Sequence, residues 1–169
     1  MDSFVIRNAK PGDGLGIATV QVQTWRDAYA GIVDQTVLDS LSIEEAGIRT
    51  EERIAESSFI RLVATVGDTI VGFAVYGWKP EKPFECEWFL FALYVLPEYQ
   101  GVGIGRGLLD RVKAFGREAG AARLVFGVLS ANEPSKEFYR RQGAVFVANH
   151  GYPIGGMMYP TDYCEIVLR

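Results

Sequence analysis

The sequence predicts an α/β (α+β) fold in which a mixed, mostly antiparallel central sheet is flanked by helices. Two early strands are separated by the dipeptide Gly67-Asp68, which is typical of a two-residue hairpin turn. The later strands alternate with helical segments, which places parallel strands next to each other in the second half. Together these observations predict the element order β-α-α-β-β-β-α-β-α-β-β within one domain, for which 169 residues are long enough.

The first half of the chain supplies four strands and two helices. A short strand from Phe4 to Asn8 precedes a helix from about Leu15 to Ala30, whose apolar residues recur at helical spacing. Ser42 and Glu45 form a capping box that begins a polar helix, which is expected to end near Ser57. Three strands are then expected over residues 60–66, 69–78 and 85–95.

The second half begins with a helix from Ile104 to Ala119, followed by a strand over 123–129 and a helix over about 134–142. Two strands over 144–149 and 163–168 complete the sheet. Between them, the segment from Tyr152 to Pro160 is interpreted as a flexible, aromatic-lined hairpin or loop. It could cover a substrate or form the contact of a homodimer.

Composition excludes several classes of protein. The net charge of −4 disfavours nucleic acid as a partner. Cys86, Cys164 and a single histidine lack metal-ligand spacing, so no metal site is expected, and two thiols in a chain of this size suit the cytoplasm. The first residues lack the apolar segment of a secretory signal, and no apolar run is long enough to span a membrane.

A glycine-rich run between a strand and a helix is the most informative motif. It follows the apolar stretch from Trp88 to Leu96. The first N–H groups of a helix are unpaired and lie at the positive end of its dipole, so this position favours a phosphate or pyrophosphate. No lysine follows as a P-loop requires, and the spacing does not fit a dinucleotide fingerprint. The run consists of Gln100, Gly101, Val102, Gly103, Ile104 and Gly105.

The remaining pattern, Gln-x-x-Gly-x-Gly, resembles the acetyl-coenzyme A signature Arg/Gln-x-x-Gly-x-Gly/Ala of the GNAT superfamily of N-acetyltransferases. The resemblance covers nearly the whole chain and is carried by residues 24–31, 93–100 and 132–144. It implies the GNAT fold and an enzyme that moves an acetyl group from acetyl-coenzyme A, its cosubstrate, to a primary amine. The amine attacks directly in a ternary complex, without a metal.

The resemblance also implies roles for individual residues. The glycine run and Arg106 hold the pyrophosphate, and the main chain of Leu93, Tyr94 and Val95 pairs with the pantetheine arm. Asn132 and Ser135 contact the cofactor near its sulfur. Tyr139, which also contacts the cofactor, is the candidate general acid, because a phenol with a pKa near ~10 can protonate a departing thiolate.

The general base is less clearly indicated. Many members of the family carry an acidic residue eleven positions before the signature glutamine, and here that position is Phe89. Glu87, acting through a water molecule, is the first candidate and Glu85 the second, because strand alternation would place both on the side of Phe89. A reaction without a dedicated base, or with help from Tyr29, Tyr152 or His150, remains an alternative.

The acceptor pocket is expected between the first two helices and the last strands, bordered by Trp25, Asp27, Tyr29 and Tyr152. Acidic residues near it would suit a cationic amine such as a polyamine or aminoglycoside; a protein N-terminus or an amino acid is also open. The replacement of the strand acid by Phe89 motivates a second hypothesis, a non-catalytic acyl-coenzyme A-binding sensor or subunit. A third hypothesis is a nucleotide-binding domain that uses the same loop.

Overall fold

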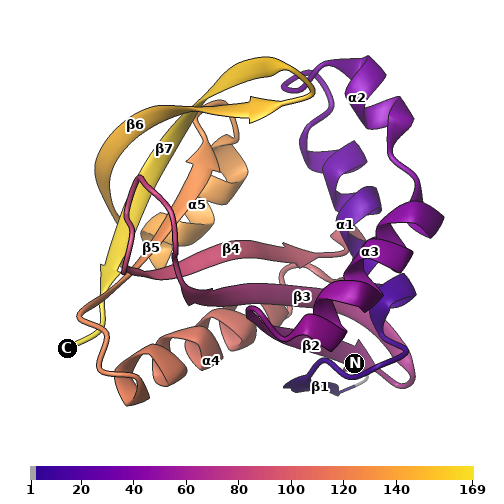
Figure 1. Cartoon of the computed structure of the whole chain (residues 1–169), viewed down its shortest axis with the longest axis horizontal. Coiled ribbons are helices and arrows are strands. Elements are labelled where there is room, and N and C mark those ends of the chain that lie inside the picture. The colour runs from indigo at the N-terminus through magenta and orange to yellow at the C-terminus, as the bar shows by residue number, and fades with distance from the viewer. Residues whose placement is uncertain (1–2) are drawn as a thin grey trace.

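The computed structural model describes residues 3–169 and contains the predicted order of elements with one added helix (Figure 1). That helix, α2, has only six residues and begins after Asp34, whose side chain accepts a hydrogen bond from the Thr36 N–H at 2.9 Å. Six residues are too few to show a helical periodicity, so the sequence pattern missed it. The elements are β1 (Phe4–Asn8), α1 (Gly14–Ala28), α2 (Gln35–Ser40), α3 (Ile43–Glu56), β2 (Ile60–Val66), β3 (Thr69–Trp78), β4 (Trp88–Val95), a 3₁₀ turn (Pro97–Tyr99), α4 (Ile104–Glu118), β5 (Arg123–Leu129), α5 (Glu133–Arg141), β6 (Val145–Ile154) and β7 (Met157–Val167).

The strands form one seven-stranded sheet in the order β1-β2-β3-β4-β5-β7-β6. All neighbouring pairs are antiparallel except β4 and β5, so the predicted mixed, mostly antiparallel sheet is confirmed. Helices cover it on both sides: the Trp88 indole of β4 donates to the Val112 carbonyl of α4 at 3.1 Å, whereas Tyr94 of the same strand contacts Tyr29 of α1. The sheet is therefore the buried middle layer.

The parallel strands β4 and β5 separate after a short stretch of pairing. Only residues 88–90 of β4 pair with residues 124–126 of β5. Phe91 is an extra residue in β4, because Val75 pairs with Ala92 while the next residue, Tyr76, pairs with Leu90. Such a bulge bends a strand and strengthens its local twist. Residues 91–95 therefore present an edge toward β5 that has no strand partner among the described residues, and Figure 1 shows the two strands diverging.

Three predicted strand boundaries were wrong. The strand expected from Glu85 begins at Trp88, because the chain before it turns back on itself, with the Cys86 N–H bonded to the Lys79 carbonyl at 2.8 Å. The segment from Tyr152 to Pro160, expected as a hairpin or loop, is a hairpin that turns at Gly155-Gly156, so β6 extends to Ile154 and β7 begins at Met157. Prolines are tolerated there because β6 is an edge strand and Pro160 lies just beyond the last paired residue of β5.

Two carboxylates fix α1 against its neighbours. Glu51 of α3 accepts hydrogen bonds from the N–H groups of Gly12 and Gly14, at 2.6 and 2.9 Å, and so caps the start of α1. Asp13 forms a bidentate pair with Arg7 of β1, at 2.7 and 3.0 Å. These contacts hold α1 in place over β3 and β4. Among residues 3–169, no helix combines the length and apolar character needed to cross a membrane.

Candidate active site

The glycine loop between β4 and α4 presents a row of unused main-chain donors. Gly101 and Gly103 adopt left-handed backbone conformations, with φ of +77° and +95°, which non-glycine residues rarely adopt. Within residues 3–169, none of the N–H groups of residues 101–106 has a hydrogen-bond acceptor, and the first satisfied donor is the Gly107 N–H, which bonds to the Gly103 carbonyl at 2.9 Å. The space beside Gly103 is open, since no atom lies within 4 Å of an added Cβ.

The surroundings of this loop are positive and well fixed. The Gln100 side chain donates to the Val95 carbonyl at 2.9 Å and so closes the loop onto the end of β4. At Gly105, α4 lies against Phe138 of α5, whose ring is 3.4 Å from the position of an added Cβ. Arg106 is exposed, and its Nε lies 3.8 Å from Asp110. An anion at the start of α4 would thus meet free N–H groups, the helix dipole and one arginine.

The open edge of β4 leads directly into this loop. On one side, Leu93, Tyr94 and Val95 pair with Ala74, Phe73 and Gly72 of β3. On the other side they face the gap left by the divergence of β4 and β5. An extended ligand can therefore pair with this edge as an added strand while its anionic end lies on the loop.

Two tyrosine hydroxyls, one from the end of α1 and one from β4, meet beside this edge. The hydroxyl oxygens of Tyr29 in α1 and Tyr94 in β4 lie 3.4 Å apart. Burial raises the pKa of Tyr29, and charge repulsion from Tyr139 and Tyr152 raises this pKa further. Burial likewise raises the pKa of Tyr94 well above its usual value. These hydroxyls therefore keep their protons at neutral pH and can donate hydrogen bonds.

Helix α5 lies on the other side of the gap. Asn132 and Ser135, the two predicted cofactor-binding residues, lie at its start, and Tyr139 follows further along the helix. Asn132 is buried and caps the helix, accepting from the Ser135 N–H at 3.3 Å. The Tyr139 ring lies on Phe126 of β5, with centroids 4.2 Å apart. Burial raises the pKa of Tyr139, with a smaller contribution from repulsion by Tyr94. Tyr139 is thus a protonated group close to the β4 tyrosine.

The two glutamates predicted as bases do not lie on β4. The Glu87 carboxylate accepts from the Arg123 guanidinium at 2.9 Å, and the same arginine also pairs with Glu165 of β7. Glu85 is exposed, 3.9 Å from Lys82. Phe89 is 7% exposed and packs against Phe91 at 5.0 Å. Both glutamates therefore precede β4, and a buried aromatic ring fills the position of the missing acid.

An aromatic cluster surrounds Phe89 instead. Tyr163 of β7 lies 6.4 Å from Phe89, and His150 of β6 lies 5.6 Å from Tyr163, both measured between ring centroids. Phe84, from the segment before β4, covers both Tyr163 and His150. Sequence reasoning named His150 only as a helper, because the register of the last hairpin, which places it here, was not predictable.

The predicted acceptor residues divide into two groups. Trp25 and Tyr29, four residues apart on α1, share one face, and their rings meet edge to face at 4.9 Å. Tyr152 is close enough to raise the pKa of both Tyr29 and Tyr94, so the hairpin and α1 border the same space. Asp27 is exposed and lies half a turn away from Trp25 and Tyr29, on the outer side of α1.

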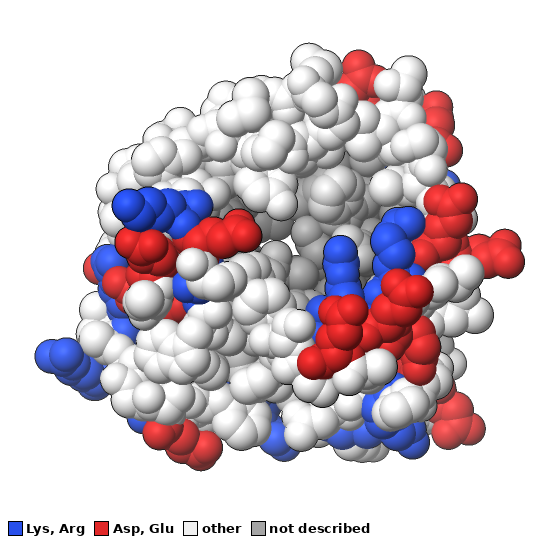
Figure 2. Space-filling view, viewed as in Figure 1, with Lys and Arg blue, Asp and Glu red and all other residues white. Residues whose placement is uncertain are grey.

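Together these elements surround a hollow. The tip of the β6–β7 hairpin reaches the start of α2, where the Tyr159 hydroxyl accepts from the Asp34 N–H at 2.9 Å. Figure 2 shows this face of the molecule hollowed near its centre, with mostly uncharged side chains around the hollow and charged groups on both flanks. Within residues 3–169, His, Cys, Asp and Glu side chains form no cluster of three or more that could hold a metal ion.

Comparisons with known proteins agree with this geometry. Residues 21–144 match the family described as the acetyltransferase (GNAT) family. The chain is 30% identical over 152 residues to the uncharacterized N-acetyltransferase YuaI of Bacillus subtilis, covering 90% of this chain and 86% of YuaI. It is 32% identical over 129 residues to the L-amino acid N-acyltransferase MnaT of Escherichia coli, covering 72% of this chain and 74% of MnaT.

A solved structure shows the same fold. The protein yncA of Salmonella typhimurium, solved with its cofactor acetyl-CoA, superposes with a TM-score of 0.70 at 22% identity, covering 99% of this chain and 95% of yncA. At this identity the likeness concerns the fold alone.

Proposed function

The chain belongs to the acetyltransferase (GNAT) family and is an acyltransferase, and from this premise we propose that it moves the acetyl group of acetyl-coenzyme A to a primary amine of a small molecule or peptide. One observation carries the proposal. The unpartnered edge at Leu93–Val95 runs directly into a loop whose N–H groups, from Gly101 to Arg106, have no acceptor among the described residues. These two stretches of free main-chain groups, joined by the turn at Pro97–Tyr99, suit a ligand with an extended amide arm and a pyrophosphate.

In this proposal the loop and Arg106 bind the pyrophosphate, and the edge of β4 pairs with the pantetheine arm. Asn132 and Ser135 lie at the start of α5 and contact the arm from the other side. The relation to yncA, which was solved with acetyl-CoA, supports this choice of cosubstrate. When bound, the cosubstrate supplies a thioester whose carbonyl carbon accepts the amine.

The residues of the chain stabilise charge and move protons as the C–N bond forms and the C–S bond breaks. A free N–H of the β4 edge donates to the carbonyl oxygen as it becomes negative. Tyr139 donates to the departing sulfur, and the raised pKa of Tyr139 ensures that its proton is present at neutral pH. In the overall balance, the amine loses one proton and the leaving thiolate gains one.

In this proposal no dedicated carboxylate removes the proton of the amine. Glu87 and Glu85 stay predictions for that role, but Glu87 is bound to Arg123 and Glu85 lies exposed beside Lys82. The Tyr29–Tyr94 pair is nearer to the reacting edge and can orient the amine or a water molecule that takes its proton. The amine that reacts is then the fraction already neutral in solution.

The test is release of free thiol from acetyl-coenzyme A across a panel of primary amines, with a no-amine control. We expect release that depends on the amine and saturates with it. Binding of acetyl-coenzyme A without release on any amine would contradict turnover. It would favour the second candidate, a non-catalytic acyl-coenzyme A sensor or subunit, which the replacement of the strand acid by Phe89 supports. The homodimer expected from the last hairpin stays a prediction.

A further inference from the structure

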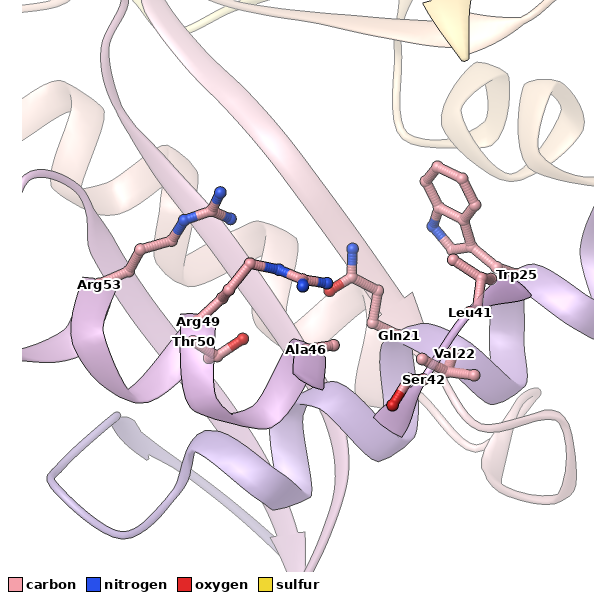
Figure 3. Close-up of a pocket in the computed structure, with 9 residues that line it drawn as sticks. All are labelled: Gln21, Val22, Trp25, Leu41, Ser42, Ala46, Arg49, Thr50 and Arg53. Atoms are coloured by element: carbon pink, nitrogen blue, oxygen red, sulfur yellow. The ribbon is translucent and has the colours of Figure 1, made fainter. Parts of the chain in front are cut away.

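A second cavity lies between α1 and α3, beside the tyrosine pair. Its volume is about 240 Å³, and it opens to solvent. Figure 3 shows the side chains of Arg49 and Gln21 extending toward each other, while Arg53 and Trp25 stand on either side of them. The cavity is lined by Gln21, Val22, Trp25, Leu41, Ser42, Ala46, Arg49, Thr50 and Arg53.

The charged groups that line this cavity are two arginines, Arg49 and Arg53. Arg49 and Arg53 are four residues apart and therefore share one face of α3. The nearest carboxylate to Arg49 is that of Glu45, at 4.0 Å, and both side chains are largely exposed, so this pair is weak. Arg53 has no ion pair within residues 3–169. Its charge also lowers the pKa of Arg61, in addition to the larger effect of burial.

Trp25 adds a third donor. Its indole nitrogen is buried and has no hydrogen-bond partner in the described part of the chain, although the Tyr94 hydroxyl is near enough to interact with it. Figure 3 shows this nitrogen on the side of the ring that faces Gln21 and Arg49. A buried N–H without a partner is uncommon and asks for an acceptor. The Tyr94 hydroxyl is the nearest group that can accept, so Trp25 connects the wall of the cavity to the edge of β4.

The cavity and the reacting edge of β4 are joined by aromatic side chains. The Trp25 ring meets the Tyr29 ring at 4.9 Å, and the Tyr29 hydroxyl reaches the Tyr94 hydroxyl at 3.4 Å. The cavity and the reacting edge therefore lie on either side of the Trp25 and Tyr29 side chains. Two arginines at this position repel a polyamine, so the cationic acceptors considered in the sequence analysis do not fit this cavity.

We propose that the cavity between α1 and α3 binds the carboxylate of the acetyl acceptor through Arg49 and Arg53, and that the acceptor is accordingly an amine that carries a carboxylate, such as a free amino acid. This inference rests on the proposed function. The planar guanidinium groups match a carboxylate in shape and charge, and Gln21 supplies a further amide donor.

The experiment measures binding of matched ligands to the full chain saturated with coenzyme A, by calorimetry. Each pair consists of an L-amino acid and its amide, and the pairs include small, acidic and basic side chains. The wild-type protein is compared with Arg49→Gln and Arg53→Gln, and with Arg111→Gln as a control that removes the same charge from an exposed position on α4. An amino acid and its amide also differ in the pKa of the amine. For each pair we therefore compare the ratio of acid affinity to amide affinity in the wild type with the same ratio in each variant.

We expect the wild type to prefer the acid of at least one pair, and each cavity variant to lose about tenfold or more of that ratio while the control keeps it. Affinity for coenzyme A, measured by separate titrations of the unsaturated proteins, stays unchanged in all variants and shows that they are folded. Equal binding of acid and amide by the wild type, or equal loss in the control, would overturn the inference. So would tighter binding of phosphoethanolamine than of β-alanine, because the cavity would then be a phosphate site.

The same samples separate this inference from the proposed function. Thiol release with some amine, together with an acid-to-amide affinity ratio that is unchanged in Arg49→Gln and Arg53→Gln, would mean that the carboxylate assignment fails. The acetyltransferase proposal would stand. If no amine supports thiol release, the proposed function fails, and the binding ratio still decides whether the cavity holds a carboxylate.

Discussion

The hydroxyl of Tyr29 on α1 lies 3.4 Å from the hydroxyl of Tyr94 on β4, at the point where β4 has lost its parallel partner. This contact joins the helix that borders the proposed acceptor cavity to the strand edge proposed to hold the thioester. It depends on the bulge at Phe91, because one extra residue exchanges the faces to which all later residues of β4 point. Tyr94 faces α1 for this reason.

Tyr139 is expected to act on the leaving sulfur and not on cofactor binding. Tyr139→Phe removes the hydroxyl but keeps the ring on Phe126, so we expect kcat to fall about 100-fold or more with little change in acetyl-coenzyme A affinity. Steady-state kinetics and calorimetry measure the two quantities. An unchanged kcat would mean that the thiolate leaves unaided or that another group donates the proton.

Glu87 is expected to contribute more to structure than to proton transfer. Glu87→Gln leaves Arg123 paired with Glu165 but removes one ionic contact, which lowers the melting temperature slightly because the pair is partly exposed. We expect kcat/KM to remain within about tenfold of wild type, since an essential base contributes about 100-fold or more. A larger loss that recovers as the pH rises toward the pKa of the amine would establish Glu87 as the base.

The Arg7–Asp13 pair predicts how stability depends on pH. The Arg7 guanidinium lowers the pKa of Asp13, and the Lys10 N–H adds a smaller effect in the same direction. A lowered pKa in the folded state gives stability that is fully present above the ordinary pKa of the carboxyl and is lost as the pH falls through the folded value. Asp13→Asn should therefore destabilise the protein by about 1–3 kcal/mol at pH 7, and by progressively less below about pH 4.

Urea unfolding at several pH values measures this difference. Asp39→Asn provides a matched control, because Asp39 is an exposed aspartate that bonds only to the neighbouring Gln35 within the described residues. A difference between wild type and Asp13→Asn that does not shrink in acid would show that the Arg7 pair is not the source of the stability.

Much of the fold follows from local patterns in the sequence. The Gly67-Asp68 turn and the Ser42 cap of α3 were both predicted from short-range chemistry and are present. Gly101 and Gly103 likewise indicated a loop with free N–H groups, since their positions depend only on the neighbouring strand and helix. Features set by a few adjacent residues can be predicted in this way.

Features that depend on distant partners could not be predicted. Glu87 was placed on a strand because no local signal shows that Arg123 will bind it or that the chain turns before Trp88. The bulge at Phe91 arises from pairing with β3 and leaves no mark in the sequence pattern. In the sequence, the spacing of Arg49 and Arg53 indicates only a solvent-exposed face of a helix. The packing of α1 against α3 is what places them around a cavity with Gln21.

The most direct test of the central claim is calorimetric titration of acetyl-coenzyme A into the wild-type protein and into Gly103→Asp. Gly103 has φ of +95°, so aspartate strains the loop and also adds a negative charge where the pyrophosphate is proposed to lie. Asp68→Asn serves as a folding control at the turn between β2 and β3. The account predicts one-site binding by the wild type and a loss of about 100-fold or more in the variant. Absence of binding by the wild type, or equal affinity in both proteins, would contradict it.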